Sequence, residues 1–245
     1  TCTGHRPIIK SIMSENVEDS SVKSGRDQGH LLEWETIDDV FLDMDGTLLD
    51  LHFDNHFWLE HVPRRYARQH GIDFEAAREK LLSMYADHVG TLKWYCIDHW
   101  TAELGLDILH LKAEVDHLIQ LHPHVDAFLQ RLQTLHKRIT LLTNAHPKTL
   151  AFKLQRIPLA DHFDQLITSH EVGLPKEHPD FWVKLQQRHP FDARRTLFVD
   201  DSLAVLRSAA NFGIARVIAI SAPDSTQQHR RIEEFTAIRD FSELL

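Results

Sequence analysis

The chain has 245 residues, of which 42% are hydrophobic and 26% charged, a composition that is ordinary for a folded protein of one or two domains. The formal net charge is −9 and the basic residues form no dense run, which argues against a nucleic-acid-binding protein. The two cysteines, Cys2 and Cys96, give no disulfide framework, and no apolar run approaches the ~20 residues that span a bilayer, so we expect a cytoplasmic protein without a signal peptide.

The amino-terminal half begins with a polar segment and then a strongly apolar one. Residues 1–30 have no hydrophobic period, so we expect a mobile tail, within which Met13 is a candidate translation start. Residues 40–42 form a continuous apolar run that predicts a strand buried on both faces. Asp43 and Asp45 follow it and begin on the same side of the strand end. Two like charges there are costly unless a cation or a proton lies between them, which indicates a functional site.

The next segment, residues 52–120, has helical periodicity and no strong strand. A simple connection between two parallel strands needs far fewer residues, so we infer an inserted all-helical domain. Pro63 is expected to kink or divide the first helix. The expected helices cover residues 54–70, 74–89, 94–104 and 108–120.

From residue 121 onward, strand and helix patterns alternate, which predicts an α/β fold with a doubly wound parallel sheet. The core domain is expected to combine residues 31–51 with residues 121–245. Strands are expected over residues 139–143, 165–168, 196–200 and, as the last strand, 216–220. Helices are expected over residues 125–136, 148–155, 179–188 and 202–212, and a short helix in the carboxyl-terminal tail.

Polar residues follow several predicted strands at their carboxyl ends, which is where parallel α/β sheets bind ligands. Carboxylates suit a hard cation such as Mg²⁺, whereas a lysine, a hydroxyl and backbone N–H groups suit a phosphate. The residue types therefore predict Mg²⁺-dependent phosphoryl transfer. The residues expected to converge are Asp43, Asp45, Thr143, Asn144, Lys176, Asp200 and Asp201.

These motifs carry a family resemblance. Asp43-Met44-Asp45-Gly46-Thr47, Thr143, Lys176 and Asp200-Asp201, in this order, resemble the four motifs of the haloacid dehalogenase superfamily of phosphatases. The helical insertion is similar to the first type of cap domain in that family. Further segments resemble the bacterial GMP/IMP nucleotidases, which implies a purine 5′-nucleotidase. They are residues 42–51, 53–55, 57–58, 94–96, 105–108 and 142–147.

The resemblance implies a role for each motif residue. Asp43 would attack phosphorus and form an aspartyl-phosphate, and Asp45 would protonate the leaving oxygen and then activate water. Thr143 would bind a phosphoryl oxygen, helped by the backbone near Asn144. Lys176 would neutralise charge on the nucleophile and on the transferring group.

The resemblance also implies Mg²⁺ held by the Asp43 carboxylate, the Asp45 main-chain carbonyl and one acid of the fourth motif. Many members of the family have Gly-Asp-x-x-x-Asp at this motif, and alignment puts Asp200 in the glycine column and Asp201 in the first aspartate column. The final aspartate column falls on Val205, which cannot ligate. Asp201 is therefore the expected ligand, and Asp200 is expected to orient either a metal-bound water or Lys176.

Some alternatives remain open. A phosphatase for a sugar phosphate or another small ester would use the same motifs, and a phospho-accepting signalling module would share the acidic pocket, the Thr and the Lys. Aromatic residues of the insertion could form its core or could stack on a purine ring. We expect a small phosphate ester as the partner, and a monomer or weak homo-oligomer. Despite 19 histidines, no His-Glu-x-x-His motif or cysteine–histidine pairing occurs, so no histidine metal site is expected.

Overall fold

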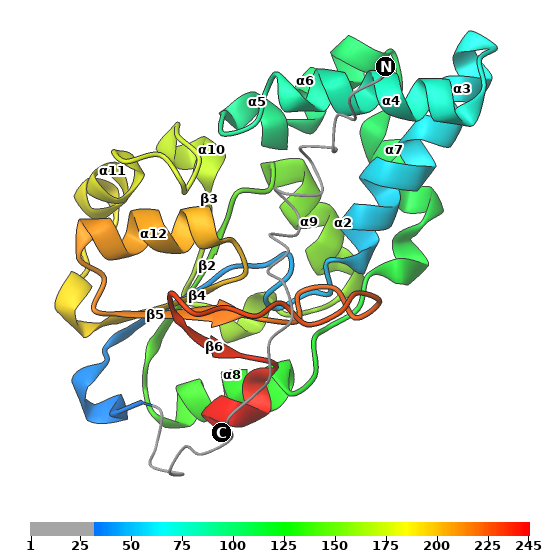
Figure 1. Ribbon diagram of the computed structural model, residues 1–245. Helices are drawn as coiled ribbons and strands as arrows, with labels where there is room; N and C mark the ends of the chain where they lie inside the picture. The colour runs from blue at the N-terminus through cyan, green and yellow to red at the C-terminus, as the bar shows by residue number, and fades with distance from the viewer. Residues whose placement is uncertain (1–31) are drawn as a thin grey trace.

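The computed structural model describes residues 32–245, and the expectations of a mobile tail over residues 1–30 and of a start at Met13 lie outside them (Figure 1). The described chain forms a parallel sheet with the strand order β3-β2-β1-β4-β5-β6, which confirms the predicted doubly wound α/β class. The strands are β1 (Asp39–Leu42), β2 (Arg138–Thr143), β3 (Gln165–Thr168), β4 (Thr196–Asp200), β5 (Arg216–Ile220) and β6 (Thr236–Ile238).

Strand β1 lies at the point where the strand order reverses. It pairs with β2 on one side and β4 on the other, so that Phe41 is in register with both Thr140 and Phe198. The chain moves outward from β1 through β2 to β3, and then returns beside β1 to build β4, β5 and β6. A crevice opens at such a reversal outside the carboxyl ends of the strands, and the predicted motifs lie there.

Both faces of the sheet are buried, which explains the continuous apolar run of β1. Val40 and Leu42 belong to one hydrophobic cluster and Phe41 to the other, because successive side chains point to opposite faces. One face packs against α8 (Val125–Thr134), α9 (Pro147–Arg156) and the 3₁₀ turn η6 (Phe241–Leu244). The other packs against α10 (Ser169–Val172), α11 (Phe181–Arg188) and α12 (Leu203–Phe212).

Residues 52–118, here called the helical insertion, separate β1 from β2 and lie together at one end of the molecule (Figure 1). Their apolar side chains join the same hydrophobic cluster as Val40 and Leu42, so the insertion packs directly on the core. Its elements are α2 (His52–His56), η2 (Phe57–His61), α3 (Val62–His70), α4 (Phe74–Ala86), α5 (Leu92–Tyr95), α6 (Ile97–Leu104), α7 (Ile108–Glu114) and η3 (Asp116–Leu118).

The first predicted helix is divided, as expected, near Pro63. Segment η2 is a π-helix, and the Val62 N–H donates to the Phe57 carbonyl five residues earlier. Pro63 lies in the first turn of α3, directly after this segment. Proline lacks an N–H and its ring crowds the carbonyl four residues earlier, and the wide π turn accommodates both effects.

Three expectations about elements were wrong. The helix expected over residues 108–120 ends at Glu114, and the separate 3₁₀ turn η3 follows it. The helix expected over residues 94–104 is broken at Cys96, whose backbone is extended (φ −88°, ψ 105°) and whose Sγ accepts a 3.5 Å hydrogen bond from the His99 N–H at the start of α6. Residues 216–220 are not the last strand, because β6 pairs in parallel with β5. With three residues, β6 is too short to carry a recognisable alternating pattern.

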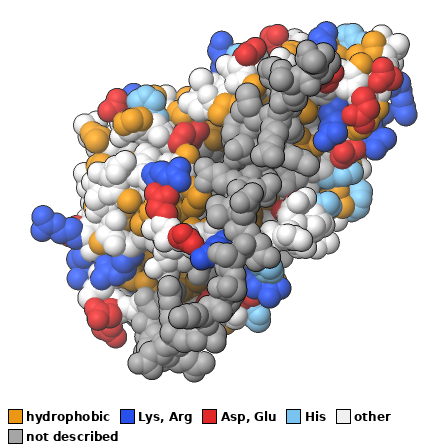
Figure 2. Space-filling view, in the orientation of Figure 1, with side chains coloured by type: hydrophobic (Ala, Val, Ile, Leu, Met, Phe, Trp, Pro, Cys, Tyr) orange, Lys and Arg blue, Asp and Glu red, His pale blue; other side chains and the backbone are white. Residues whose placement is uncertain are grey.

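The visible face of the described chain carries acidic and basic side chains in a mixed arrangement, most clearly over the outer end of the helical insertion (Figure 2). Ion pairs within the helical insertion include Arg64 with Glu60 and Arg65 with Glu114. None of the helices in residues 32–245 combines the length and the apolar character that crossing a membrane requires.

Candidate active site

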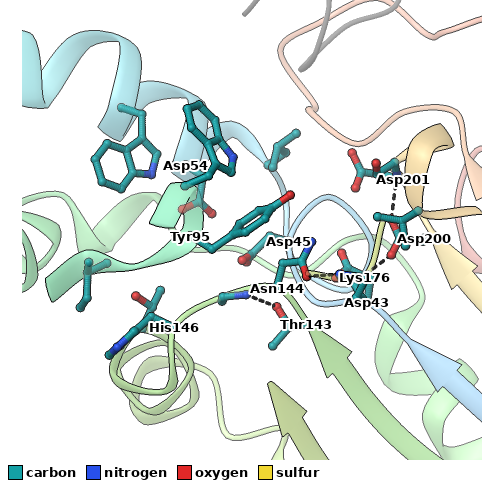
Figure 3. A pocket seen from close by; sticks show the side chains of 18 of the residues that line it. Asp43, Asp45, Asp54, Tyr95, Thr143, Asn144, His146, Lys176, Asp200 and Asp201 are labelled. Atoms are coloured by element: carbon teal, nitrogen blue, oxygen red, sulfur yellow. Dashed lines mark hydrogen bonds and ion pairs between the residues drawn. The ribbon is translucent and has the colours of Figure 1, made fainter. Parts of the chain in front are cut away.

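A pocket lies between the carboxyl ends of the central strands and the helical insertion (Figure 3). All seven predicted site residues line it, so tertiary structure brings together groups that are far apart in the sequence. They are Asp43, Asp45, Thr143, Asn144, Lys176, Asp200 and Asp201. The insertion adds an aromatic wall of Trp58, Tyr85, Trp94, Tyr95 and Trp100.

Lys176 joins two of the carboxylates. Its Nζ donates to Asp43 Oδ1 at 2.5 Å, to Asp200 Oδ2 at 2.6 Å and to the Leu142 carbonyl at 3.0 Å. The side chain is 2% exposed. Burial alone would lower the pKa of Lys176, but the two carboxylates outweigh it and raise that pKa above its ordinary value. The ammonium group is therefore charged and has a fixed position beside Asp43.

Asp43 directly follows β1, and its N–H donates to the Val199 carbonyl of β4 at 3.0 Å. Burial raises the pKa of Asp43 well above its usual range, and the charges of Asp200, Asp201 and Asp45 add to this effect although Lys176 opposes it. The carboxylate is thus held in a region with excess negative charge. A bound cation would relieve this repulsion.

The two acids after β4 have different surroundings. Both side-chain oxygens of Asp200 accept hydrogen bonds, one from Lys176 and one from the Ser202 N–H at 2.8 Å. The Asp201 carboxylate lies 3.7 Å from Arg230 Nη2, and burial raises its pKa to about 7. Ligand oxygens of Asp43, Asp200 and Asp201 all lie within 4.8 Å of one another, a geometry that suits a hard cation.

Gly46 makes room for Asp201 beside the first motif. Its φ of +85° favours glycine, and a Cβ added there would lie 2.7 Å from Asp201 Cγ. The turn after Asp45 therefore depends on a residue without a side chain, both for its backbone conformation and for the close approach of the fourth motif.

Thr143 and Asn144 at the end of β2 make different contacts. Thr143 Oγ1 accepts a 3.0 Å hydrogen bond from the Ala145 N–H, which leaves the hydroxyl hydrogen available to donate to an anion. The Asn144 side chain accepts from the Lys176 N–H at 2.9 Å and donates to Glu177 at 2.9 Å. It therefore holds the loop that carries Lys176, and a direct contact between Asn144 and substrate stays a prediction.

Sequence reasoning missed a second buried ionic group, which lies beside the pocket. Lys153 on α9 donates to Asp45 Oδ1 and to Asp54 Oδ2, each at 2.5 Å, and Lys112 on α7 donates to Asp54 Oδ1 at 3.1 Å. Both lysines are 1% exposed. Although burial opposes it, these ammonium groups lower the pKa of Asp54 to about 2. A lysine in a predicted helix is usually solvated, so local pattern could not identify either one.

Tyr95 connects the helical insertion to the loop of Lys176. Its hydroxyl donates to Glu177 Oε1 at 2.9 Å, and the other oxygen of Glu177 accepts from Asn144. Burial raises the pKa of Tyr95 well above its ordinary value, so the hydroxyl remains a neutral donor. Figure 3 shows Tyr95 and Asp54 reaching toward the pocket from the insertion.

The aromatic wall serves as core and pocket lining together. Tyr85 and Trp100 meet edge to face with ring centroids 5.0 Å apart, and Trp58 contacts Tyr85 at 5.7 Å. The buried Tyr85 hydroxyl has no hydrogen-bond partner within residues 32–245, and the same is true of the Thr149 hydroxyl. Both residues line the pocket. An unpartnered buried hydroxyl is costly, and a bound ligand with a polar edge would satisfy it.

Comparison with known proteins agrees with this geometry. The family model for haloacid dehalogenase-like hydrolases matches residues 37–213. The chain is 39% identical over 214 residues to the GMP/IMP nucleotidase YrfG of Escherichia coli, covering 87% of this chain and 96% of that protein. It is 26% identical over 195 residues to a glyceraldehyde 3-phosphate phosphatase of Pyrococcus abyssi, covering 73% and 79% respectively.

A solved structure shares the fold. The crystal structure of a HAD phosphatase from Thermococcus onnurineus superposes with a TM-score of 0.70 at 24% identity, over 85% of this chain and 96% of that one. From the matched family model and the nucleotidase relative we conclude that this chain belongs to the haloacid dehalogenase-like hydrolases.

Proposed function

We propose that this protein is a Mg²⁺-dependent 5′-nucleotidase that hydrolyses GMP or IMP to nucleoside and phosphate. The observation that carries the proposal is the continuity of one pocket, in which the cluster of carboxylates and Lys176 opens onto an aromatic wall. The charged end suits a phosphate and the aromatic end suits a flat heterocycle. The 39% identity to a GMP/IMP nucleotidase supports the same substrate class.

In this proposal residues 52–120 act as a cap domain over a core of residues 31–51 and 121–245. Two cap residues contact the core directly: Tyr95 donates to Glu177, and Asp54 accepts from Lys153. A third cap residue, Lys112, donates to Asp54 and so supports the second contact. These links would let the cap exclude bulk water while substrate is bound.

The residues present fit Mg²⁺. Three carboxylates offer oxygens within 4.8 Å of one another, and Lys176 donates to two of them, Asp43 and Asp200, so the site has more negative charge than this lysine neutralises. The Asp43 and Asp201 carboxylates and the Asp45 main-chain carbonyl would hold the ion, because both Asp200 oxygens already accept hydrogen bonds. When bound, Mg²⁺ would neutralise negative charge on the transferring phosphoryl group.

Asp43 and Asp45 carry the two chemical steps. Asp43 attacks phosphorus to form an aspartyl-phosphate while the bond to the nucleoside oxygen breaks, and Asp45 gives that oxygen its proton. Asp45 then removes a proton from the water that attacks the aspartyl-phosphate, which releases phosphate and restores both carboxyl groups. Burial raises the pKa of Asp45, which favours the protonated form that the first step needs.

The remaining motif residues orient the phosphate. Lys176 stabilises the charge of Asp43 and of the transferring group from its position 2.5 Å from Asp43 Oδ1. Asp200 and Asn144 act as positioning residues for Lys176, one through its ammonium and the other through its backbone N–H. The Thr143 hydroxyl donates to a phosphoryl oxygen.

A phosphate-release screen tests the substrate. Purified protein with Mg²⁺ would be assayed against nucleoside monophosphates, sugar phosphates and glyceraldehyde 3-phosphate, because the Pyrococcus relative favours the last as a second candidate. GMP and IMP are expected among the best substrates, and Asp43→Asn is expected to abolish release. If only the sugar phosphate or glyceraldehyde 3-phosphate is hydrolysed, the nucleotidase proposal fails while the phosphatase activity stands.

We further propose a cytoplasmic location and a monomer or weak homo-oligomer. A concentration-dependent sedimentation experiment tests the second point, since a stable assembly at every concentration would contradict it.

A further inference from the structure

Beside the phosphate pocket lies a second cluster with different chemistry. Cys96, His146 and His170 each offer one ligand atom, and these atoms lie within 4.8 Å of one another. We propose that Cys96, His146 and His170 form a separate binding site for a transition-metal dication, with Zn²⁺ as the fitting ion. Binding of the metal does not require the proposed nucleotidase activity.

The three residues come from three different elements. Cys96 is the extended residue between α5 and α6 in the helical insertion, His146 is the N-cap of α9 after β2, and His170 lies in α10 after β3. No short spacing in the sequence connects them, which is why motif reading predicted no histidine metal site. Parallel strands β2 and β3 are neighbours, so the chain segments after them lie at one edge of the sheet.

His170 is the strongest single observation for a ligand. Both of its ring nitrogens are buried, and neither has a hydrogen-bond partner within the described residues. Burial lowers the pKa of His170 to about 4, and the neighbouring His146 adds to that effect. The imidazole is therefore neutral near pH 7, with a free lone pair. Two unsatisfied buried nitrogens are costly, and coordination of a metal by one of them would remove part of that cost.

His146 has a partner suited to orient it. Its Nε2 lies 3.6 Å from Asp98 Oδ2, and its Nδ1 accepts a 3.3 Å hydrogen bond from the Lys148 N–H, a long distance for such a bond. Asp98 is in turn held by Lys148 Nζ at 2.7 and 2.9 Å. A carboxylate next to a ligating imidazole is the usual second partner of histidine in zinc sites. Burial also lowers the pKa of His146, which keeps it neutral.

The donor set selects the metal. One thiolate and two imidazoles suit Zn²⁺, which binds sulfur and nitrogen in tetrahedral geometry, and they do not suit Mg²⁺, which requires oxygen. Three protein ligands leave the fourth position for water. The sulfur–metal bond forms as the Cys96 thiol releases its proton to solvent.

Metal binding would join the helical insertion to the core. Cys96 belongs to the insertion and both histidines to the core, while His146 also lines the substrate pocket. Because Tyr95 precedes Cys96 and contacts Glu177, a metal here would fix the contact between the insertion and the loop of Lys176. We therefore expect Zn²⁺ bound at this cluster to slow turnover in the neighbouring substrate pocket.

Cobalt spectroscopy provides the main test. Purified full-length protein, reduced and freed of metal, is titrated with Co²⁺ with Mg²⁺ in excess. A near-ultraviolet thiolate-to-cobalt band is expected, saturating at one Co²⁺ per chain and lost on adding Zn²⁺. The carboxylate cluster has no sulfur and cannot give this band. Absence of the band, or its survival in Cys96→Ser, would overturn the proposal.

Matched variants identify the ligands. Cys2→Ser removes the other cysteine of the chain and is expected to keep the band, and loss of the band in that variant would contradict the assignment. His170→Asn is expected to weaken Zn²⁺ binding by at least ~10–100-fold, whereas His162→Asn, which changes a histidine outside the cluster, leaves it unaltered. Equal affinities in the two variants would exclude His170 as a ligand.

A further measurement needs no variant and so does not depend on Cys96→Ser folding. Thiol alkylation of the unmodified protein is followed by peptide mass spectrometry with and without Zn²⁺. Zn²⁺ is expected to slow alkylation of Cys96 and to leave Cys2 unaffected. Unchanged alkylation of Cys96 at saturating Zn²⁺ would overturn the proposal.

Discussion

Lys153 Nζ lies 2.5 Å from Asp45 Oδ1 and 2.5 Å from Asp54 Oδ2, so one buried ammonium group joins the proposed acid–base residue to the helical insertion. Burial raises the pKa of Asp45, and Lys153 opposes that rise. The lysine thus influences both the position of the Asp45 carboxyl group and the pH at which it holds a proton. Its contact with Asp54 makes both properties depend on how the insertion packs.

Replacing Lys153 by Met should lower kcat by about 10²-fold while KM changes little, because the variant disturbs proton transfer and not phosphate binding. Loss of the neighbouring cation raises the pKa of Asp45 further, so the limb of the pH–kcat profile that belongs to Asp45 moves to higher pH. Steady-state kinetics across pH measures both effects.

Lys184→Met on α11 is the matched control, because that lysine is exposed, and its profile should equal that of the parent. Lys153→Arg keeps the positive charge and serves as a second variant in case Lys153→Met folds poorly. Its kcat is expected to lie between those of Lys153→Met and the parent. A Lys153→Met profile that coincides with the parent profile would show that the ion pair has no role in catalysis.

Variants of the two acids after β4 should differ in how their activity depends on the Mg²⁺ concentration. Asp201→Asn is expected to raise the Mg²⁺ concentration needed for half-maximal activity by roughly 10-fold or more, because it removes a proposed ligand. Asp200→Asn releases one partner of Lys176, so kcat should fall even at saturating Mg²⁺. Titration of activity with Mg²⁺ distinguishes them, and the reverse pattern would exchange their assigned roles.

The Tyr85 hydroxyl should contribute to recognition of the base. Tyr85→Phe is expected to lower kcat/KM for GMP or IMP by ~10-fold, near the value of one hydrogen bond, and to leave an aryl phosphate unaffected. Stability should not fall, since the variant removes a hydroxyl without a partner among residues 32–245. Tyr66→Phe, in the same insertion but outside the pocket lining, is the control. Equal losses for nucleotide and aryl phosphate would contradict a contact with the base.

Metal-free protein should lose stability as pH rises toward neutrality. The pKa of Asp201 is raised from 3.8 to about 7, so its contribution to folding is complete below pH 3.8 and is lost as pH rises through about 7. The contribution of Asp54 to stability changes with pH in the opposite direction. Its pKa is lowered to about 2, so its contribution is lost only as pH falls from 3.8 toward that value. The two windows therefore do not overlap.

Mg²⁺ competes with the proton on these carboxylates, so its stabilising effect should grow with pH. Thermal melting with and without Mg²⁺ should give a larger rise in Tm at about pH 8 than at about pH 5. Asp201→Asn should reduce this difference. An equal rise in Tm at both pH values would argue against carboxylate ligation by Asp201.

The pattern of the core strands could be predicted because it follows from local chemistry. The apolar run at residues 40–42 and the acids after it follow from a strand that is buried on both faces and ends at a ligand site. Strand β6 and the break at Cys96 escaped prediction for a physical reason. Three residues are too few to reveal a period, and the extended backbone at Cys96 depends on the packing around it.

The α/β fold, the family and the motif residues around Asp43 could all be predicted, since alternating hydrophobicity and the order of polar residues can be read along the chain. The surroundings of these residues became apparent only in the folded protein. Lys153 and Lys112 became buried partners of carboxylates, and Cys96 came to lie beside two histidines. The reason is that burial and ion pairing depend on which chain segments meet in space, and helical periodicity contains no information about such distant partners.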